Sequence, residues 1–351
     1  MKPAARLAIS LVLTALFITL FLRSFDLRAA WRALSEASPA LIALSALVNL
    51  AGYVIRAWRW RFLLAPVRRN LGMYNLTSTT MIGLMISFLV PFRVGEVVRP
   101  VLLARRERFG AGPALATIAL ERLMDVLIVM TLFLAFVLSA RGATVLGPSA
   151  AGGQAALLLR RGVLAAALFV LIGLPLLAVL VAIPGRVVAL LHRLNPGHRT
   201  GPAGRAIGSL ETFVQGLDVL RRPRDLAPCL AVSLALWLVL DLSIFLGVRA
   251  FGLGLRYTDI FLLMLPLGIG IAVPTPGGVG PYEYLGQTSL TGFFGVAPAT
   301  AGATAITLHA ITLVPTIAVG LFFMWRDGLK PSEVRRMAAL QDAAAPGERA
   351  S

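Results

Sequence analysis

The stretch Pro274-Thr-Pro-Gly-Gly-Val-Gly-Pro281 lies inside a long apolar block, Asp259–Phe294, and decides how this chain folds. Three prolines and three glycines in eight residues interrupt helical hydrogen bonding, and unpaired backbone groups are tolerated in lipid only where protein or a water-filled cavity covers them. A second block, Asn75–Arg105, is broken in the same way at Pro91-Phe-Arg-Val-Gly-Glu96. Each block is too long for one span, so we interpret both as re-entrant helical hairpins.

The remaining sequence predicts an all-α, polytopic membrane protein. Of the 351 residues, 58% are hydrophobic and only 14% are charged, which is far from the average of soluble domains. Helices that cross a bilayer need about 20 apolar residues. Six stretches fit full spans: Leu7–Leu22, Leu41–Ile55, Leu115–Leu138, Val163–Ile183, Pro228–Val248 and Thr300–Trp325.

Charge counting sets the orientation, because cytoplasmic loops collect Lys and Arg. With the N-terminus inside and both hairpins re-entrant, 22 of the 33 lysines and arginines fall in inner segments and eight in outer ones. We therefore expect a multi-pass protein of the cell membrane with both termini in the cytoplasm, and a bacterial inner membrane fits best. The net charge of +17 suits loops that face anionic lipid, so we expect no nucleic-acid partner.

The same topology predicts one transmembrane domain, residues 1–326, followed by a cytoplasmic, disordered tail, residues 327–351. Each half reads span, span, hairpin, span, and the halves 1–143 and 158–326 begin on opposite sides of the membrane. Inverted repeats of this kind are typical of transporters, which place the substrate at the midplane where broken helices meet. In the alternative reading, the two Gly/Pro breaks arose independently in a helix-rich protein.

Charged residues at membrane depth mark the candidate site, since they are usually functional and paired. Arg93, Glu96 and Arg99 belong to the first hairpin, where an arginine fork and an exposed helix N-terminus would bind an anion such as phosphate. Glu121 and Asp125 are one turn apart on the next helix, beside Arg122, and are candidate proton carriers.

The second hairpin and the protein–lipid interface add further candidates. The second hairpin contributes substrate-binding candidates that allow close backbone approach, with a carboxylate just beyond: Gly277, Gly278, Gly280 and Glu283. A second set, at the cytoplasmic end of the second span, is expected to meet lipid headgroups: Arg56, Arg59 and Arg61. Two further residues are weighed as packing residues: His309, and Asp241, for which transport is an equal alternative. As an alternative, the charges of the first half form a buried network that only fixes hairpin packing.

Four motifs in order carry a resemblance to a known family. They are Arg59-Trp-Arg-Phe-Leu-Leu64, Pro91-Phe-Arg-Val-Gly-Glu-Val-Val-Arg99, Glu121-Arg-Leu-Met-Asp125 and Pro274-Thr-Pro-Gly-Gly-Val-Gly-Pro-Tyr-Glu283. Together, over residues 5 to 326, the chain resembles the flippase-like transmembrane region of lysylphosphatidylglycerol synthases and the stand-alone proteins related to it. The resemblance implies translocation of a lipid between leaflets. The soluble domain that makes the lipid in the synthases has no counterpart in this sequence, which leaves the substrate open.

The leading hypothesis is therefore a flippase for an anionic phospholipid or a polyprenyl-phosphate-linked lipid. Its partners would be membrane lipids with anionic heads, and we expect no catalytic residue, cofactor or metal. One alternative is an intramembrane lipid-modifying enzyme that uses Glu121 and Asp125 as acid and base. Another is a membrane partner subunit of a soluble lipid-modifying enzyme.

Overall fold

The computed structural model describes residues 3–23, 25–146, 167–169, 171–173, 223–330, 332–333 and 337. Within these ranges the chain forms helices and no strand, which confirms the expected all-α class. The first-half helices are α1 (Pro3–Leu22), α2 (Leu27–Glu36), α3 (Pro39–Leu64), α4 (Met73–Leu89), α5 (Gly95–Glu107), α6 (Ala111–Val137) and α7 (Ala140–Val145). The later helices are α11 (Pro223–Ala250), α12 (Ile260–Ala272), α13 (Pro281–Phe294) and α14 (Pro298–Arg326). Short 3-10 turns are η1 (Pro91–Arg93), η3 (Tyr257–Asp259) and η4 (Pro276–Gly278).

Three described helices are long and apolar enough to cross a membrane: α3, most of α11, and α14. Helices α1 and α2 add a fourth if they count as one span, although the chain bends by 82° between them. Helix α6 has the length but carries three charged residues near its centre. Most of the expected span Val163–Ile183, apart from residues 167–169 and 171–173, and most of the expected tail lie outside the described residues. The described part thus gives three or four candidate spans, where the sequence predicted six.

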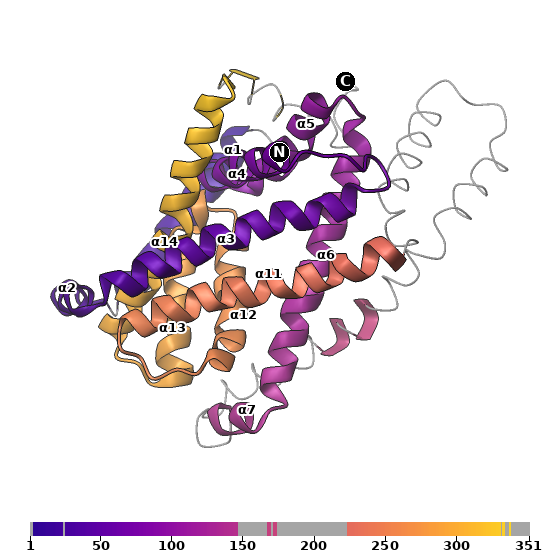
Figure 1. Cartoon of the computed structure of the whole chain (residues 1–351). Coiled ribbons are helices and arrows are strands. Elements are labelled where there is room, and N and C mark those ends of the chain that lie inside the picture. The colour runs from indigo at the N-terminus through magenta and orange to yellow at the C-terminus, as the bar shows by residue number, and fades with distance from the viewer. Residues whose placement is uncertain are drawn as a thin grey trace, which may run out of the picture.

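Helices α3 and α11 run antiparallel, side by side through the fold (Figure 1). At one end the N–H of Ser38 donates to the carbonyl of Ala250 (2.8 Å). Further along, the hydroxyls of Ser45 and Ser243 each donate to the other residue's carbonyl, at 2.6 and 2.9 Å. A Cβ on Gly52 would collide with α11. Small residues therefore allow close approach of these two backbones, as they do in membrane helix pairs generally.

The two broken blocks fold back on themselves as helical hairpins, α4–η1–α5 and α12–η4–α13. In the first hairpin, a Cβ on Gly95 would lie 1.8 Å from the carbonyl oxygen of Gly83. In the second, a Cβ on Gly270 would lie 2.7 Å from the Cα of Tyr282. Both hairpins thus depend on glycine where their limbs cross.

The tips of the two hairpins share an unusual backbone. Phe92 and Arg93 have φ angles of +64° and +54°, and Gly277 and Gly278 have φ angles of +64° and +80°. In each tip these two residues follow the proline that opens the 3-10 turn. Glycine adopts this left-handed region freely, whereas other residues do so at a cost. The first tip therefore carries side chains where the second carries none.

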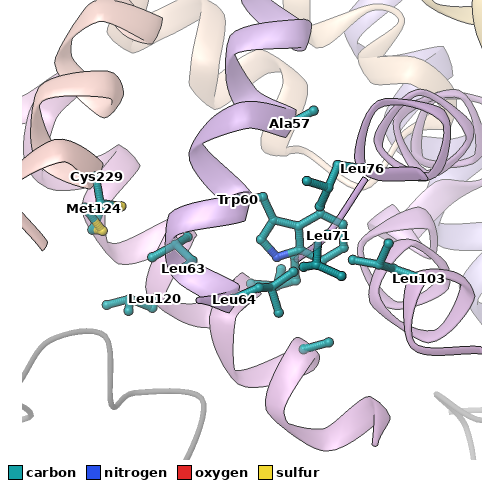
Figure 2. Packing of buried hydrophobic residues seen from close by; sticks show 12 residues of the cluster. Ala57, Trp60, Leu63, Leu64, Leu71, Leu76, Leu103, Leu120, Met124 and Cys229 are labelled. Atoms are coloured by element: carbon teal, nitrogen blue, oxygen red, sulfur yellow. The ribbon is translucent and has the colours of Figure 1, made fainter. Parts of the chain in front are cut away.

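An apolar cluster packs α3 against the first hairpin and α6 (Figure 2). Trp60 is fully buried in this cluster, together with Leu76 of α4 and Leu103 of α5. The indole N–H of Trp60 donates to the hydroxyl of Thr117 on α6 (2.9 Å), so the buried polar atom is satisfied. This packing fixes the rotation of α3 and hence the direction in which its arginines point.

The end of α14 is tied to the first hairpin by Asp327. Its carboxylate accepts hydrogen bonds from Tyr74 and Ser78 of α4 and pairs with Arg106 of α5 at 2.7 Å. Burial opposes ionisation of Asp327, but these hydrogen bonds and the charge of Arg106 outweigh it and hold the pKa of the carboxyl below its ordinary value. The ionised form of Asp327 therefore stabilises this junction.

Candidate functional site

A cavity of about 440 Å³ lies between the tips of the two hairpins, with α3, α6 and α11 as its other walls. The second hairpin contributes backbone to it through Gly277 and Gly278. Most of the other lining is apolar. Its charged lining residues are Arg56, Arg93, Glu96, Arg99, Arg122 and Asp125.

Two buried carboxylates on α6, those of Glu121 and Asp125, lie at the centre of this group of charged side chains. Arg56 donates to both, at 3.0 Å to Glu121 and 3.1 Å to Asp125. Arg59 donates to Asp125 at 2.5 Å, and the indole N–H of Trp237 on α11 donates to the same oxygen at 3.0 Å. The carboxylates thus join three helices, α3, α6 and α11.

Arg56 and Arg59 lie inside the fold, although the sequence analysis expected them at the membrane interface with Arg61. Arg59 is fully buried and Arg56 is 5% exposed, while Arg61 faces outward. The difference arises because α3 continues as one helix to Leu64, well past the expected end of the span at Ile55. Residues three apart share a helix face, so Arg56 and Arg59 point together at α6.

Arg99 of α5 and Arg122 of α6 complete the shell around Glu121. Arg99 donates to both carboxylate oxygens at 3.2 Å, and Arg122 donates to one at 2.6 Å. The guanidinium of Arg99 also lies over the ring of Trp60, 3.9 Å from its centroid, a favourable cation–π arrangement. Among the described residues, Nε and Nη2 of Arg99 have no hydrogen-bond partner. Arg99 is also one of the residues that line the cavity.

The outer part of the cluster is partly exposed. Arg93 pairs with Glu96 at 3.0 Å, and Glu96 lies 3.7 Å from Arg122. All three side chains are between 30% and 39% exposed, whereas those of Arg56, Arg59 and Arg99 are at most 7% exposed.

The cluster as a whole carries an excess of positive charge. It contains five arginines and three carboxylates: Arg56, Arg59, Arg93, Arg99 and Arg122 with Glu96, Glu121 and Asp125. Every one of these arginines contacts a carboxylate, and with all side chains ionised the cluster carries a net charge of +2. Guanidinium groups match the geometry of phosphate and carboxylate oxygens. In the described ranges, no three His, Cys, Asp or Glu side chains are placed to hold a metal ion.

The predicted residues of the second hairpin form a separate contact. Glu283 accepts the N–H of Gly280 (2.7 Å), and its other oxygen lies 2.5 Å from Nδ1 of His309. Nε2 of His309 lies 2.8 Å from the carbonyl oxygen of Gly277. The ring of Tyr282 stacks on the imidazole, with 4.4 Å between centroids. Glu283 therefore faces its own hairpin and α14 instead of the arginine cluster.

His309 was interpreted from the sequence as a packing residue, yet it is the partner of Glu283. A signal for this pairing lies in the spacing. Glu283 and His309 are 26 residues apart, and so are Glu96 and Arg122. Both pairs join the second limb of a hairpin to the helix that follows it.

Asp241 of α11 stands apart from both groups. It is fully buried, and neither of its carboxylate oxygens has a hydrogen-bond partner in the part of the chain that the structure describes. It does not line the cavity. A buried polar group without a hydrogen bond lowers stability, so Asp241 is a structural liability at this position.

Comparisons with known proteins agree with the fold and with the motifs. The family model described as "Lysylphosphatidylglycerol synthase TM region" matches residues 5–320. The chain is also 26% identical, over 346 residues, to a protein named Glycosyltransferase AglD from Haloferax volcanii. That alignment covers 89% of this chain and 53% of the relative, so the chain spans about half the relative's length. With its apolar helices, this multi-pass membrane protein belongs to the family of the lysylphosphatidylglycerol synthase transmembrane region.

Proposed function

We propose that this protein moves a lipid with an anionic head between the two leaflets of the membrane. The observation that carries the proposal is a cavity of about 440 Å³, mostly apolar, lined on one side by a charge cluster with an excess of arginine. An anionic phospholipid and a polyprenyl-phosphate-linked lipid share the chemistry that this site would bind. Membership of a family named for a lipid synthase supports a lipid-related function.

Within this proposal the residues divide their roles. Arg93 and Arg99 would bind phosphate oxygens, and Glu96 would orient Arg93 until the lipid arrives. Glu121 and Asp125 already accept hydrogen bonds from several arginines. These contacts support a role for the two carboxylates as counter-ions that position the arginines.

The placement in the membrane is also part of the proposal. We take both hairpins as re-entrant and the two halves as inverted repeats, which brings the two tips together at the midplane. The matching φ angles of the tips support this arrangement. The reciprocal bonds between Ser45 and Ser243 support it as well, because a two-fold axis in the membrane plane relates antiparallel helices in this way.

Leaflet exchange in proteoliposomes tests the function. Fluorescent anionic phospholipids and a short polyprenyl phosphate would be compared in wild type, Arg93→Gln and Arg99→Gln, with Arg249→Gln as the control. Arg249 is an exposed arginine outside the cluster. We expect wild type and Arg249→Gln to move at least one lipid, and the two cluster variants to lose most of that rate.

Equal rates in all four proteins would refute the arginine site. Absence of movement in every protein would refute translocation by this chain alone. A change in the mass of the lipid would instead indicate the lipid-modifying enzyme, and movement only after addition of a soluble enzyme would indicate the partner subunit.

A further inference from the structure

We infer that Glu283 and His309 form a proton-binding site that holds the tip of the second hairpin closed. The two ring nitrogens of His309 each face an oxygen at hydrogen-bond distance, the carboxylate of Glu283 on one side and the carbonyl of Gly277 on the other. A backbone carbonyl only accepts hydrogen bonds, so Nε2 must be the donor to Gly277. The bond to Glu283 then requires a second proton.

That second proton can be bound to either of two atoms, and the number of protons on the pair is the same in both cases. Either it is on Nδ1, which makes His309 an imidazolium beside an ionised carboxylate, or it is on Glu283, which then donates to Nδ1. In both forms the pair contains one proton more than a neutral histidine and a carboxylate. If this proton leaves, only one ring nitrogen keeps its hydrogen. Either Nδ1 then turns a lone pair toward the carboxylate oxygen 2.5 Å away, or Nε2 turns one toward the carbonyl oxygen of Gly277, and that contact becomes repulsive.

The pair is attached to both ends of the hairpin tip. His309 binds Gly277 at the start of the break, and Glu283 binds the N–H of Gly280 at its end. Gly277 also lines the cavity. A proton on the pair therefore fixes the backbone that forms the second wall of the site, and loss of the proton releases it.

The side chains that surround Glu283 and His309 do not gain or lose a proton in the pH range of the test. From α13 the ring of Tyr282 stacks on the imidazole, and from α3 the phenol of Tyr53 interacts with Tyr282. Among the described residues, the ion pair of His309 is with Glu283 alone, and α4, α11 and α12 add no charged partner to it. Neither phenol ionises in the range where a histidine changes its charge, about pH 5 to 8.

A comparison with the corresponding pair in the first half of the chain explains why the proton-binding site lies in the second half. At the matching spacing, Glu96 faces Arg122, and a guanidinium keeps its proton at every physiological pH. Histidine in place of arginine makes only the second pair titratable. As a driving site for lipid movement the pair rests on the proposed function, whereas its control of the hairpin tip does not.

Cysteine labelling tests the site without any lipid transport. In a Cys229→Ala background, Val279→Cys places a thiol in the tip, and its rate of labelling is divided at each pH by that of Leu138→Cys. Leu138, at the C-terminal end of α6, is 83% exposed and makes no contact with the tip of the second hairpin through Glu283 or His309, so it corrects for thiol ionisation. We expect the ratio to rise about fivefold between pH 5.5 and pH 8, as one hydrogen-bonded contact is lost.

Two variants of the pair make the result specific. In Glu283→Gln, the amide donates to Nδ1 of a neutral imidazole while its oxygen accepts from Gly280, so the contact no longer needs the extra proton. We expect a low ratio that stays flat with pH. His309→Arg reproduces the first-half pair and should also be flat. Gel-filtration profiles confirm that each variant is folded.

The inference is wrong if the ratio in the parent protein does not change with pH, or if Glu283→Gln responds to pH as the parent does. A proton-binding site that passes this test while no lipid moves in the leaflet-exchange assay would leave the inference standing and remove only the proposed function.

Discussion

The two helical hairpins have the same backbone turn at their tips and different chemistry on it. The first tip holds Phe92 and Arg93 at positive φ and presents charge to the cavity through Arg93, Glu96 and Arg99. The second uses glycine at the same two places and presents backbone, and the ion pair beside its tip contains a histidine. One architecture therefore supplies a charged wall of the cavity and an uncharged one.

The largest effect is expected from a comparison of the fully buried carboxylate of Glu121 in the first half with the part-buried carboxylate of Glu283 in the second. Glu121→Ala leaves several buried arginines without their shared partner, and breaking a buried ion pair in this way costs about 3–5 kcal/mol. Glu283→Ala removes a carboxylate with two hydrogen bonds and should cost less, about 1.5–3 kcal/mol. Denaturant unfolding in detergent measures both. Equal losses would mean that the two walls differ less than their contacts indicate.

A change of opposite sign is expected at Asp241, the buried carboxylate that belongs to neither wall. Asp241→Leu removes two oxygens that lack a hydrogen-bond partner among the described residues and should stabilise the protein by about 1–3 kcal/mol. The matched control is Asp125→Leu, which strips Arg56 and Arg59 of a partner and should destabilise it. A loss of stability in both variants would show that Asp241 has a function in the fold.

The backbone of the tips is tested by adding a methyl group to the second one. Gly278→Ala must hold alanine at a φ of +80°, with its Cβ 3.2 Å from the Cα of Ile271. We expect a loss of about 1–2 kcal/mol. Gly292→Ala in α13 has nothing within 4 Å of the new Cβ and serves as the control, because alanine favours a helix. If both variants are equally stable, the left-handed tip is not required.

The smallest effect is expected where the first hairpin meets α14, outside the cavity. Asp327→Asn should lower stability by about 1 kcal/mol or less. The pKa of Asp327 is lowered in the folded protein, so the stabilisation by its ionised form is complete above the ordinary value of 3.8 and is lost as the pH falls through the lowered pKa. Thermal unfolding should therefore distinguish the variant at pH 6 and not at strongly acid pH.

Sequence alone located the hairpins and most of the charge in the site. The Pro and Gly breaks mark the tips because these two residue types themselves disrupt a helical backbone. Glu121 and Asp125 stand out because charged residues are rare in apolar helices. The family resemblance predicted from the four motifs is confirmed. What these signals share is that each can be found within a single segment.

The inward role of Arg56 and Arg59 was not predictable in the same way. It depends on where α3 ends and on its rotation, which is fixed by packing of Trp60 against α4, α5 and α6. The partnership of His309 likewise depends on α14 lying beside the second hairpin. Such contacts join segments far apart in the chain, and periodicity within one segment does not encode them.

The charges of α6 also have a consequence for biosynthesis. Three charged residues near the centre of a helix oppose its insertion into lipid as a single helix, since each raises the insertion free energy by about 2.5–3.5 kcal/mol. The arginines that neutralise Glu121 and Asp125 come largely from α3 and α5. Both helices precede α6 in the chain and leave the ribosome first. The partners of these charges are therefore already made when α6 emerges, so the carboxylates of α6 can be neutralised as soon as the helix forms.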